Sequence, residues 1–188
     1  IRLFHSMICI YATINCSKMN GFFQKDVISI RDLGKKDLDS IFSATEKIIS
    51  LDPNQRREIA RGKTLGYLFF EPSTRTRLSF QSAMALIGGT SLGIADVSSS
   101  SVQKGESLSD TVRVMSGYTD VLVLRHPLDG SSRFSAEISQ KPIINGGSGT
   151  EEHPTQAIQD LFTIKREKKK IDGLKIGIVG DLKYGRTV

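Results

Sequence analysis

The chain has 188 residues, of which 38% are hydrophobic and 24% charged, and its formal net charge is +6. It has no apolar run near the roughly 20 residues of a membrane span, and its aromatic residues are not interleaved with basic ones as in single-strand nucleic-acid binders. The composition predicts a globular protein of one domain or slightly more, whose positive charge favours an anionic metabolite over nucleic acid or a membrane.

The first residues carry little pattern. Cys9 and Cys16 both lie there, so neither a disulfide framework nor a Cys-based metal site is predicted. Residues 1–18 contain no acidic residue, and they fit neither a transit peptide nor a secretory signal well. We interpret Met19 as the natural start and residues 1–18 as an upstream leader.

Strand and helix patterns alternate along the body of the chain. After a short extended segment at 27–30, strands are expected at residues 64–70, 90–97, 121–124 and 142–145. Helices are expected at residues 32–50, 73–87, 107–118, 132–139 and 154–168, and polar loops at 98–101 and 146–152. This alternation predicts an α/β fold, with a parallel sheet covered by helices on both faces.

The end of the sequence adds a further strand pattern. Residues 174–181 are typical of a buried parallel strand followed by a loop. Because a strand by itself cannot pair its backbone, we expect residues 171–188 to be the incomplete start of a second α/β domain. Residues 19–150 would then form the first domain, and residues 151–170 a linking helix.

A phosphate site is predicted where the strand at 64–70 meets the helix at 73–87. The connecting sequence, residues 71–77, reads Glu-Pro-Ser-Thr-Arg-Thr-Arg. The first turn of the helix would hold Ser73, Thr74, Arg75 and Thr76. Free backbone N–H groups and the positive end of the helix dipole attract anions there. A plain helix cap is the alternative, but three hydroxyls and a guanidinium in one turn favour phosphate binding.

Other candidate residues also follow predicted strands, at the sheet edge where open α/β sheets bind ligands. These residues are Ser100, Arg125 and His153. A strand-end arginine can be a plain surface residue, but this edge favours function for Arg125. His153 begins a helix one turn before Gln156 and as a neutral imidazole can donate to a carbonyl oxygen; chemistry leaves its structural and functional interpretations open. Lys104, taken by itself, would be a solvated loop lysine. No metal-ligand spacing or nucleotide-binding loop appears in the sequence, so no cofactor or metal is expected.

The sequence of residues 71–80, Glu-Pro-Ser-Thr-Arg-Thr-Arg-Leu-Ser-Phe, resembles the carbamoyl-phosphate signature of the aspartate and ornithine carbamoyltransferases. The resemblance extends from about Gln24 to Val188. Two motifs distinguish members of this family: His153-Pro154-Thr155-Gln156 and the sequence of residues 180–187. Both resemble the aspartate enzymes, since the ornithine enzymes typically have Cys where Thr155 stands.

The resemblance implies roles for the candidate residues. The phosphate would be bound by Ser73, Thr74, Arg75 and Thr76. The carbamoyl oxygen would be contacted by Thr76, Arg125 and His153, and its nitrogen by Gln156. Ser100 and Lys104 match a loop that reaches into the active site of a neighbouring subunit, and Arg186 matches a residue that binds the aspartate carboxylates together with Lys104.

The resemblance also implies an activity: transfer of the carbamoyl group from carbamoyl phosphate to L-aspartate, without cofactor or metal, in pyrimidine biosynthesis. It further implies a cytoplasmic homotrimer with shared active sites, and it leaves the presence of regulatory chains open. The alternatives are transfer to ornithine or another amine, and a non-catalytic phosphate-binding fragment. We expect the 188-residue chain itself to be inactive, because the remaining aspartate-binding groups would follow Val188.

Overall fold

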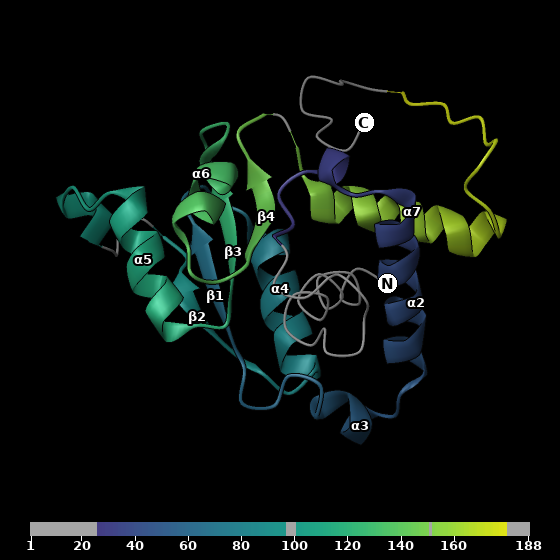
Figure 1. Ribbon diagram of the computed structural model, residues 1–188, viewed down its shortest axis with the longest axis horizontal. Coiled ribbons are helices and arrows are strands. Elements are labelled where there is room, and N and C mark those ends of the chain that lie inside the picture. The colour runs from purple at the N-terminus through teal and green to yellow at the C-terminus, as the bar shows by residue number, and fades with distance from the viewer. Residues whose placement is uncertain (1–25, 97–100, 151, 180–188) are drawn as a thin grey trace.

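The computed structural model describes residues 26–96, 101–150 and 152–179. Within them, four parallel strands form one sheet in the order β2-β1-β3-β4 (Figure 1). The strands are β1 (Thr64–Phe69), β2 (Thr90–Ile94), β3 (Val121–His126) and β4 (Ile143–Ser148). Val27 adds an isolated parallel bridge to Ile144. The expected parallel α/β fold is confirmed.

Helices cover both faces of this sheet. The α-helices are α2 (Lys35–Ser50), α3 (Pro53–Arg57), α4 (Thr74–Leu86), α5 (Leu108–Tyr118), α6 (Ser131–Ile138) and α7 (Pro154–Lys168), and the 3-10 helices are η2 (Ile30–Asp32) and η4 (Ser101–Lys104). None of the described helices is long and apolar enough to cross a lipid bilayer.

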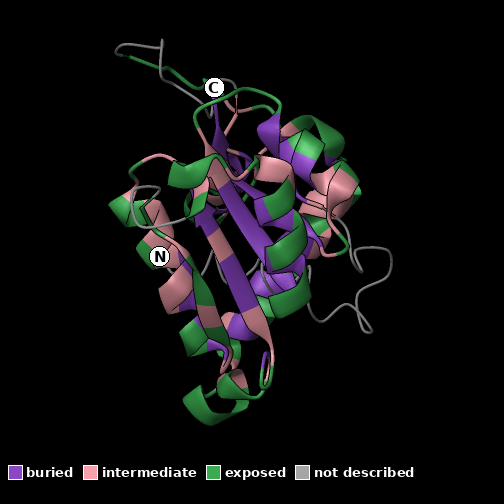
Figure 2. Ribbon diagram, turned by 90° about the vertical axis from the view of Figure 1, so that its left-hand side faces the viewer, coloured by how far each residue is buried: buried purple, intermediate pink, exposed green. Residues whose placement is uncertain are grey.

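Successive side chains of β3 point to opposite faces of the sheet, and they belong to two separate layers of the core. Val121 and Val123 belong to a cluster that includes residues of α2, α4 and α7. Leu122 and Leu124 belong to one that includes residues of α5, and partly buried residues of α6 pack against it. All four side chains are fully buried, as expected for a strand with both faces covered. Figure 2 shows the buried strands between these helical layers.

Several predicted boundaries shift in the structure. The helix expected at 32–50 begins at Lys35, because η2 ends at Asp32 and the extended residues Leu33 and Gly34 separate it from α2. The short helix α3 was missed: Asp52 caps it by accepting hydrogen bonds from the backbone N–H groups of Asn54 and Gln55. Five residues are too few to display an apolar period, so only the Asp-Pro start signal could have revealed this helix.

Two predicted loop and strand assignments are wrong. The expected loop at 146–152 begins as strand, because β4 continues through Gly146 and Gly147 to Ser148, which pairs with His126 of β3. The expected strand at 174–181 is absent from residues 174–179, which form no regular structure and expose Ile176, Ile178 and Val179. Apolar content cannot make a strand without a paired neighbour, and none of the described strands pairs with this segment. The proposed leader at 1–18 and residues 97–100 and 180–188 lie outside the described part of the chain.

Candidate functional site

The junction between β1 and α4 presents a helix start to the carboxyl edge of the sheet. β1 ends at Phe69, and α4 begins at Thr74 with Ser73 as its N-cap residue. The Ser73 hydroxyl makes no capping hydrogen bond to the helix in the described structure. Thr74 and Arg75 are exposed, and Thr76 is half-buried. First-turn N–H groups that are not capped by a side chain form an anion-binding position.

Packing and backbone geometry hold this helix start in place. Phe80, Ala83 and Met84 of α4 are buried in the core. The helix ends before Gly88, whose φ of 88° is in the left-handed region. A Cβ at Gly88 would lie 1.6 Å from the Arg57 carbonyl oxygen, so only glycine fits this turn.

Arg125 lies near the end of β3 and is held on two sides. One of its terminal nitrogens is 2.5 Å from a carboxylate oxygen of Glu71, and the other donates a hydrogen bond of 3.1 Å to the Gly146 carbonyl. The Arg125 side chain is only 14% exposed. A half-buried guanidinium with a carboxylate partner keeps both its charge and a defined orientation.

The N-terminus of α7 contributes the third side of the site. His153 is the N-cap residue, and its Nδ1 lies 3.2 Å from the Thr155 hydroxyl. Pro154 occupies the first helical position, where its missing N–H costs no hydrogen bond. Gln156 is half-buried and donates through Nε2 to Asp160 one turn later, at 3.0 Å.

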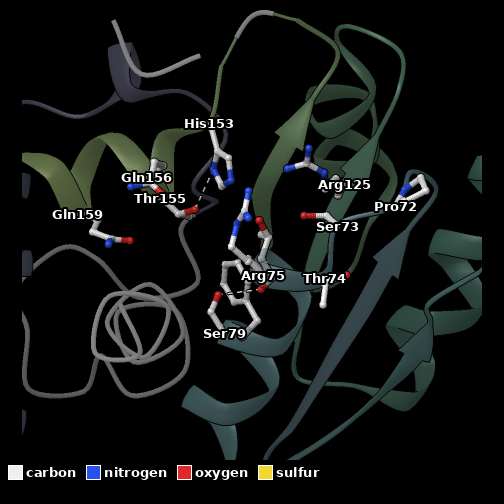
Figure 3. Close-up of a pocket in the computed structure, with 12 residues that line it drawn as sticks. Pro72, Ser73, Thr74, Arg75, Ser79, Arg125, His153, Thr155, Gln156 and Gln159 are labelled. Carbon is white, nitrogen blue, oxygen red and sulfur yellow. Dashed lines mark hydrogen bonds between the residues drawn. The ribbon is translucent and has the colours of Figure 1, made fainter. Parts of the chain in front are cut away.

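These three elements surround a cavity of about 560 Å³ (Figure 3). The cavity brings together the predicted site residues Ser73, Thr74, Arg75, Thr76, Arg125, His153 and Gln156. Pro72, Ser79, Phe80, Thr155 and Gln159 also line it. Sequence reasoning missed Ser79 and Gln159 as lining residues. The signal was their spacing: each lies three residues after a predicted site residue and so shares its helix face.

One predicted residue lies away from this cavity, and two more fall outside the described part of the chain. In the part of the chain that the structure describes, Lys104 is exposed on η4 and does not line the cavity. Ser100 and Arg186 lie outside the described residues.

The cavity is suited to an anion. Its described lining residues include two arginines and no acidic side chain. Glu71, outside the lining, balances the charge of Arg125. No group of three or more His, Cys, Asp or Glu that could hold a metal ion occurs among the described residues. Hydroxyls, helix N–H groups, guanidinium groups and an imidazole together suit a phosphate with a polar carbonyl group beside it.

His126, next to Arg125 on β3, has a different environment. Its ring packs against Phe70 with centroids 5.0 Å apart, and its Nδ1 accepts a hydrogen bond of 3.1 Å from the Leu128 backbone N–H. Burial lowers the pKa of His126 below its ordinary value of 6.5, against the opposing effect of nearby Glu71. The neutral imidazole thus stabilises the turn after β3.

Comparison with known proteins places these features in a family context. The family model described as "Aspartate/ornithine carbamoyltransferase, carbamoyl-P binding domain" matches residues 25–166. A relative from Nitrosopumilus maritimus, named aspartate carbamoyltransferase catalytic subunit, is 76% identical over 170 residues, which are 90% of this chain and 55% of the relative. A relative of the same name from Thermococcus gammatolerans is 54% identical over 165 residues, covering 87% of this chain and 54% of the relative.

Solved structures of aspartate transcarbamoylases also match this chain. The catalytic subunit of M. jannaschii aspartate transcarbamoylase matches with a TM-score of 0.80 and 52% identity, over 87% of this chain and 54% of that one. Aspartate transcarbamoylase from Trypanosoma cruzi, in complex with carbamoyl phosphate and aspartate, matches with a TM-score of 0.78 and 39% identity, over the same shares. The chain therefore spans about half the length of the relatives that it matches.

Proposed function

Because this chain belongs to the aspartate/ornithine carbamoyltransferase family through its carbamoyl-phosphate-binding domain, we propose that the full-length protein transfers a carbamoyl group from carbamoyl phosphate to L-aspartate. One observation carries the proposal: the β1–α4 junction, the end of β3 and the start of α7 bring seven predicted ligand-binding residues to one cavity. The names of the similar proteins support aspartate as the acceptor.

Carbamoyl phosphate would bind with its phosphate on the first turn of α4. Ser73, Thr74, Arg75 and Thr76 would surround the phosphate oxygens, where backbone N–H groups and the helix dipole add to the guanidinium charge. The carbonyl oxygen would then lie among Thr76, Arg125 and His153, and the carbamoyl nitrogen near Gln156. Each of these residues lines the cavity.

The chemistry follows from these positions. The aspartate amine attacks the carbonyl carbon and forms the new C–N bond, and negative charge grows on the carbonyl oxygen. Thr76, Arg125 and His153 would stabilise that charge by hydrogen bonds already in place. The C–O bond to phosphate then breaks, its electron pair leaves with the phosphate, and the phosphate takes the amine proton. Holding two anions in contact is the main catalytic task.

The acceptor and the quaternary structure complete the proposal. Arg186 and Lys104 would bind the aspartate carboxylates, and Ser100 and Lys104 would act in the cavity of a neighbouring subunit of a cytoplasmic homotrimer. The position of Lys104 outside the cavity of its own chain is compatible with a role in another subunit. Residues 19–150 would form the carbamoyl-phosphate domain, α7 the link, and residues from 171 the start of the acceptor domain.

The test is an acceptor assay on the full-length protein. With carbamoyl phosphate, we expect L-aspartate to give N-carbamoyl-L-aspartate and one equivalent of phosphate, at roughly 1 per second or faster. Carbamoylation of L-ornithine instead would assign the chain to another branch of the family. Phosphate binding without turnover of either amine would mark it as a non-catalytic binding protein. Analytical ultracentrifugation tests the trimer and shows whether further chains co-purify.

A further inference from the structure

The hydrogen bond between Gln156 and Asp160 determines which end of the Gln156 amide remains available to the cavity. Gln156 lines the cavity, whereas Asp160 is exposed one helical turn later and does not line it in the described structure. The Gln156 Nε2 donates to the Asp160 Oδ1 at 3.0 Å. Residues four apart lie on the same helix face, so this pair forms within α7.

Chemistry fixes which end of the amide bonds to Asp160. An ionised carboxylate has only acceptor oxygens, whereas a glutamine amide has an NH₂ group that donates and an oxygen that accepts. Asp160 therefore holds the NH₂ group of Gln156. The amide oxygen, Oε1, is left for other partners. Rotating the amide by half a turn would place two acceptors against each other and break the bond.

We propose that Asp160 is a positioning residue that makes Gln156 a hydrogen-bond acceptor toward the cavity, and thereby selects an acyl phosphate that carries an NH₂ group. The inference rests on the proposed function, because it concerns the ligand of the same site. It goes further in naming a residue outside the cavity, and a specificity that this residue controls.

The affinities for carbamoyl phosphate and acetyl phosphate can be compared to reveal this specificity. They have nearly the same shape and the same phosphate charge, but one carries NH₂ where the other carries methyl. An amide oxygen at Gln156 can accept from the NH₂ group and gains nothing from the methyl. A site built to hydrogen-bond a group rejects the analogue that lacks it, since the polar partner then loses its hydrogen bond.

The experiment compares the binding of both ligands to the full-length protein by titration calorimetry. The measured quantity is the ratio of the two dissociation constants, acetyl phosphate over carbamoyl phosphate. Because both ligands carry the same charge, this ratio cancels the general effect of removing a nearby carboxylate. Asp160→Ala should lower the ratio by roughly three- to tenfold, the range of one neutral hydrogen bond.

Two further variants test whether Asp160 acts by positioning Gln156. Asp160→Glu keeps an acceptor within reach of Gln156 and should restore most of the ratio. Glu167→Ala removes another exposed carboxylate from α7, at a residue outside the cavity lining, and should leave the ratio unchanged.

The outcomes separate this inference from the proposed function. Wild-type protein that does not bind carbamoyl phosphate would overturn both. Wild-type protein that binds carbamoyl phosphate, with an unchanged ratio in Asp160→Ala, would overturn only the role of Asp160. An equal weakening of both ligands in Asp160→Ala would show a purely structural contribution and would also overturn it.

Discussion

Arg125 illustrates how the fold fixes the orientation of a single charged side chain. The Arg125 side chain is 14% exposed, and its guanidinium is held between the Glu71 carboxylate and the Gly146 carbonyl. In the full-length protein, Arg125→Ala should cost about 3 kcal/mol of transition-state stabilisation, as for loss of one oxyanion donor. The measurement is kcat/KM for carbamoyl phosphate at saturating aspartate, which should fall at least a hundredfold.

A matched arginine controls for lost surface charge. Arg113 on α5 is 61% exposed and pairs with Asp110 three residues earlier, and exposed pairs of this kind contribute little. Arg113→Ala should keep wild-type kcat/KM. An Arg125→Ala enzyme with unchanged kcat/KM would remove Arg125 from the reaction.

The residues that line the cavity include some that the sequence pointed to by residue type and others that only the folded structure revealed. Ser73, Thr74 and Arg75 could be predicted because hydroxyls and a guanidinium at a strand–helix junction have a specific use. Gln159 had only its spacing from Gln156 as a signal, since a helical glutamine is ordinary until the structure shows that its face lines the cavity. The bond between Gln156 and Asp160 likewise depends on side-chain rotamers that spacing alone does not fix.

The predictable elements were those whose own residues determine them. α7 matches the expected helix at 154–168 because Pro154 marks its start and its apolar period is regular. β4 was predicted too short because glycines carry no side-chain pattern, and its last residues are strand only through their pairing with β3. The error at residues 174–179 has the same origin, since pairing is a property of the sheet and not of the segment.

The turn after β3 should respond to pH through His126. Its neutral Nδ1 accepts from the Leu128 N–H, and burial lowers its pKa. A histidine with a lowered pKa in the folded state stays neutral there while the unfolded chain takes up a proton. Its contribution to stability is therefore complete above the unfolded pKa of 6.5 and is lost as pH falls below it. Urea unfolding of the full-length protein should show a smaller free energy of unfolding below this pH.

The control for this pH effect is His126→Asn. The asparagine side-chain oxygen can still accept from the Leu128 N–H, but it does not titrate. The difference in free energy of unfolding between wild type and variant should therefore shift in favour of the variant as pH falls below 6.5. A difference that is constant with pH would show that His126 does not titrate differently in the folded state.

At the scale of the whole molecule, the proposed sharing of sites between subunits can be tested by mixing inactive chains. Arg75 lines the cavity of its own chain, while Lys104 lies outside it. If Lys104 serves a neighbouring subunit, trimers that combine Lys104→Ala and Arg75→Ala chains should contain some sites without either substitution. We expect the mixture to recover part of the wild-type activity, measured as carbamoyl-aspartate formation.

The control for this experiment is each variant mixed with itself after the same dissociation and reassembly, which should stay inactive. Native mass spectrometry confirms that mixed trimers have formed. Mixed trimers without activity would indicate that each chain completes its own site.

The described structure also divides into a packed body and an exposed end. α7 ends at Lys168, and its aromatic ring at Phe162 packs against Phe42 of α2 with centroids 5.6 Å apart. Beyond it, residues 174–179 form no regular structure, and Val179 is 99% exposed. Backbone that is neither paired nor buried is open to proteases, whereas a packed helix is not.

Limited digestion of the 188-residue polypeptide with trypsin should therefore cut first at Lys169, Lys170 and Lys175, beyond the end of α7, and leave the packed body with α7 resistant. The relatives are nearly twice as long as the matched region. In the full-length protein, added contacts should slow cleavage at the same lysines, because a strand with paired neighbours is protected. Mass spectrometry of timed digests measures both rates. Equal protection of residues 171–179 in the two proteins would contradict the prediction, since the segment would then be held by the described body itself.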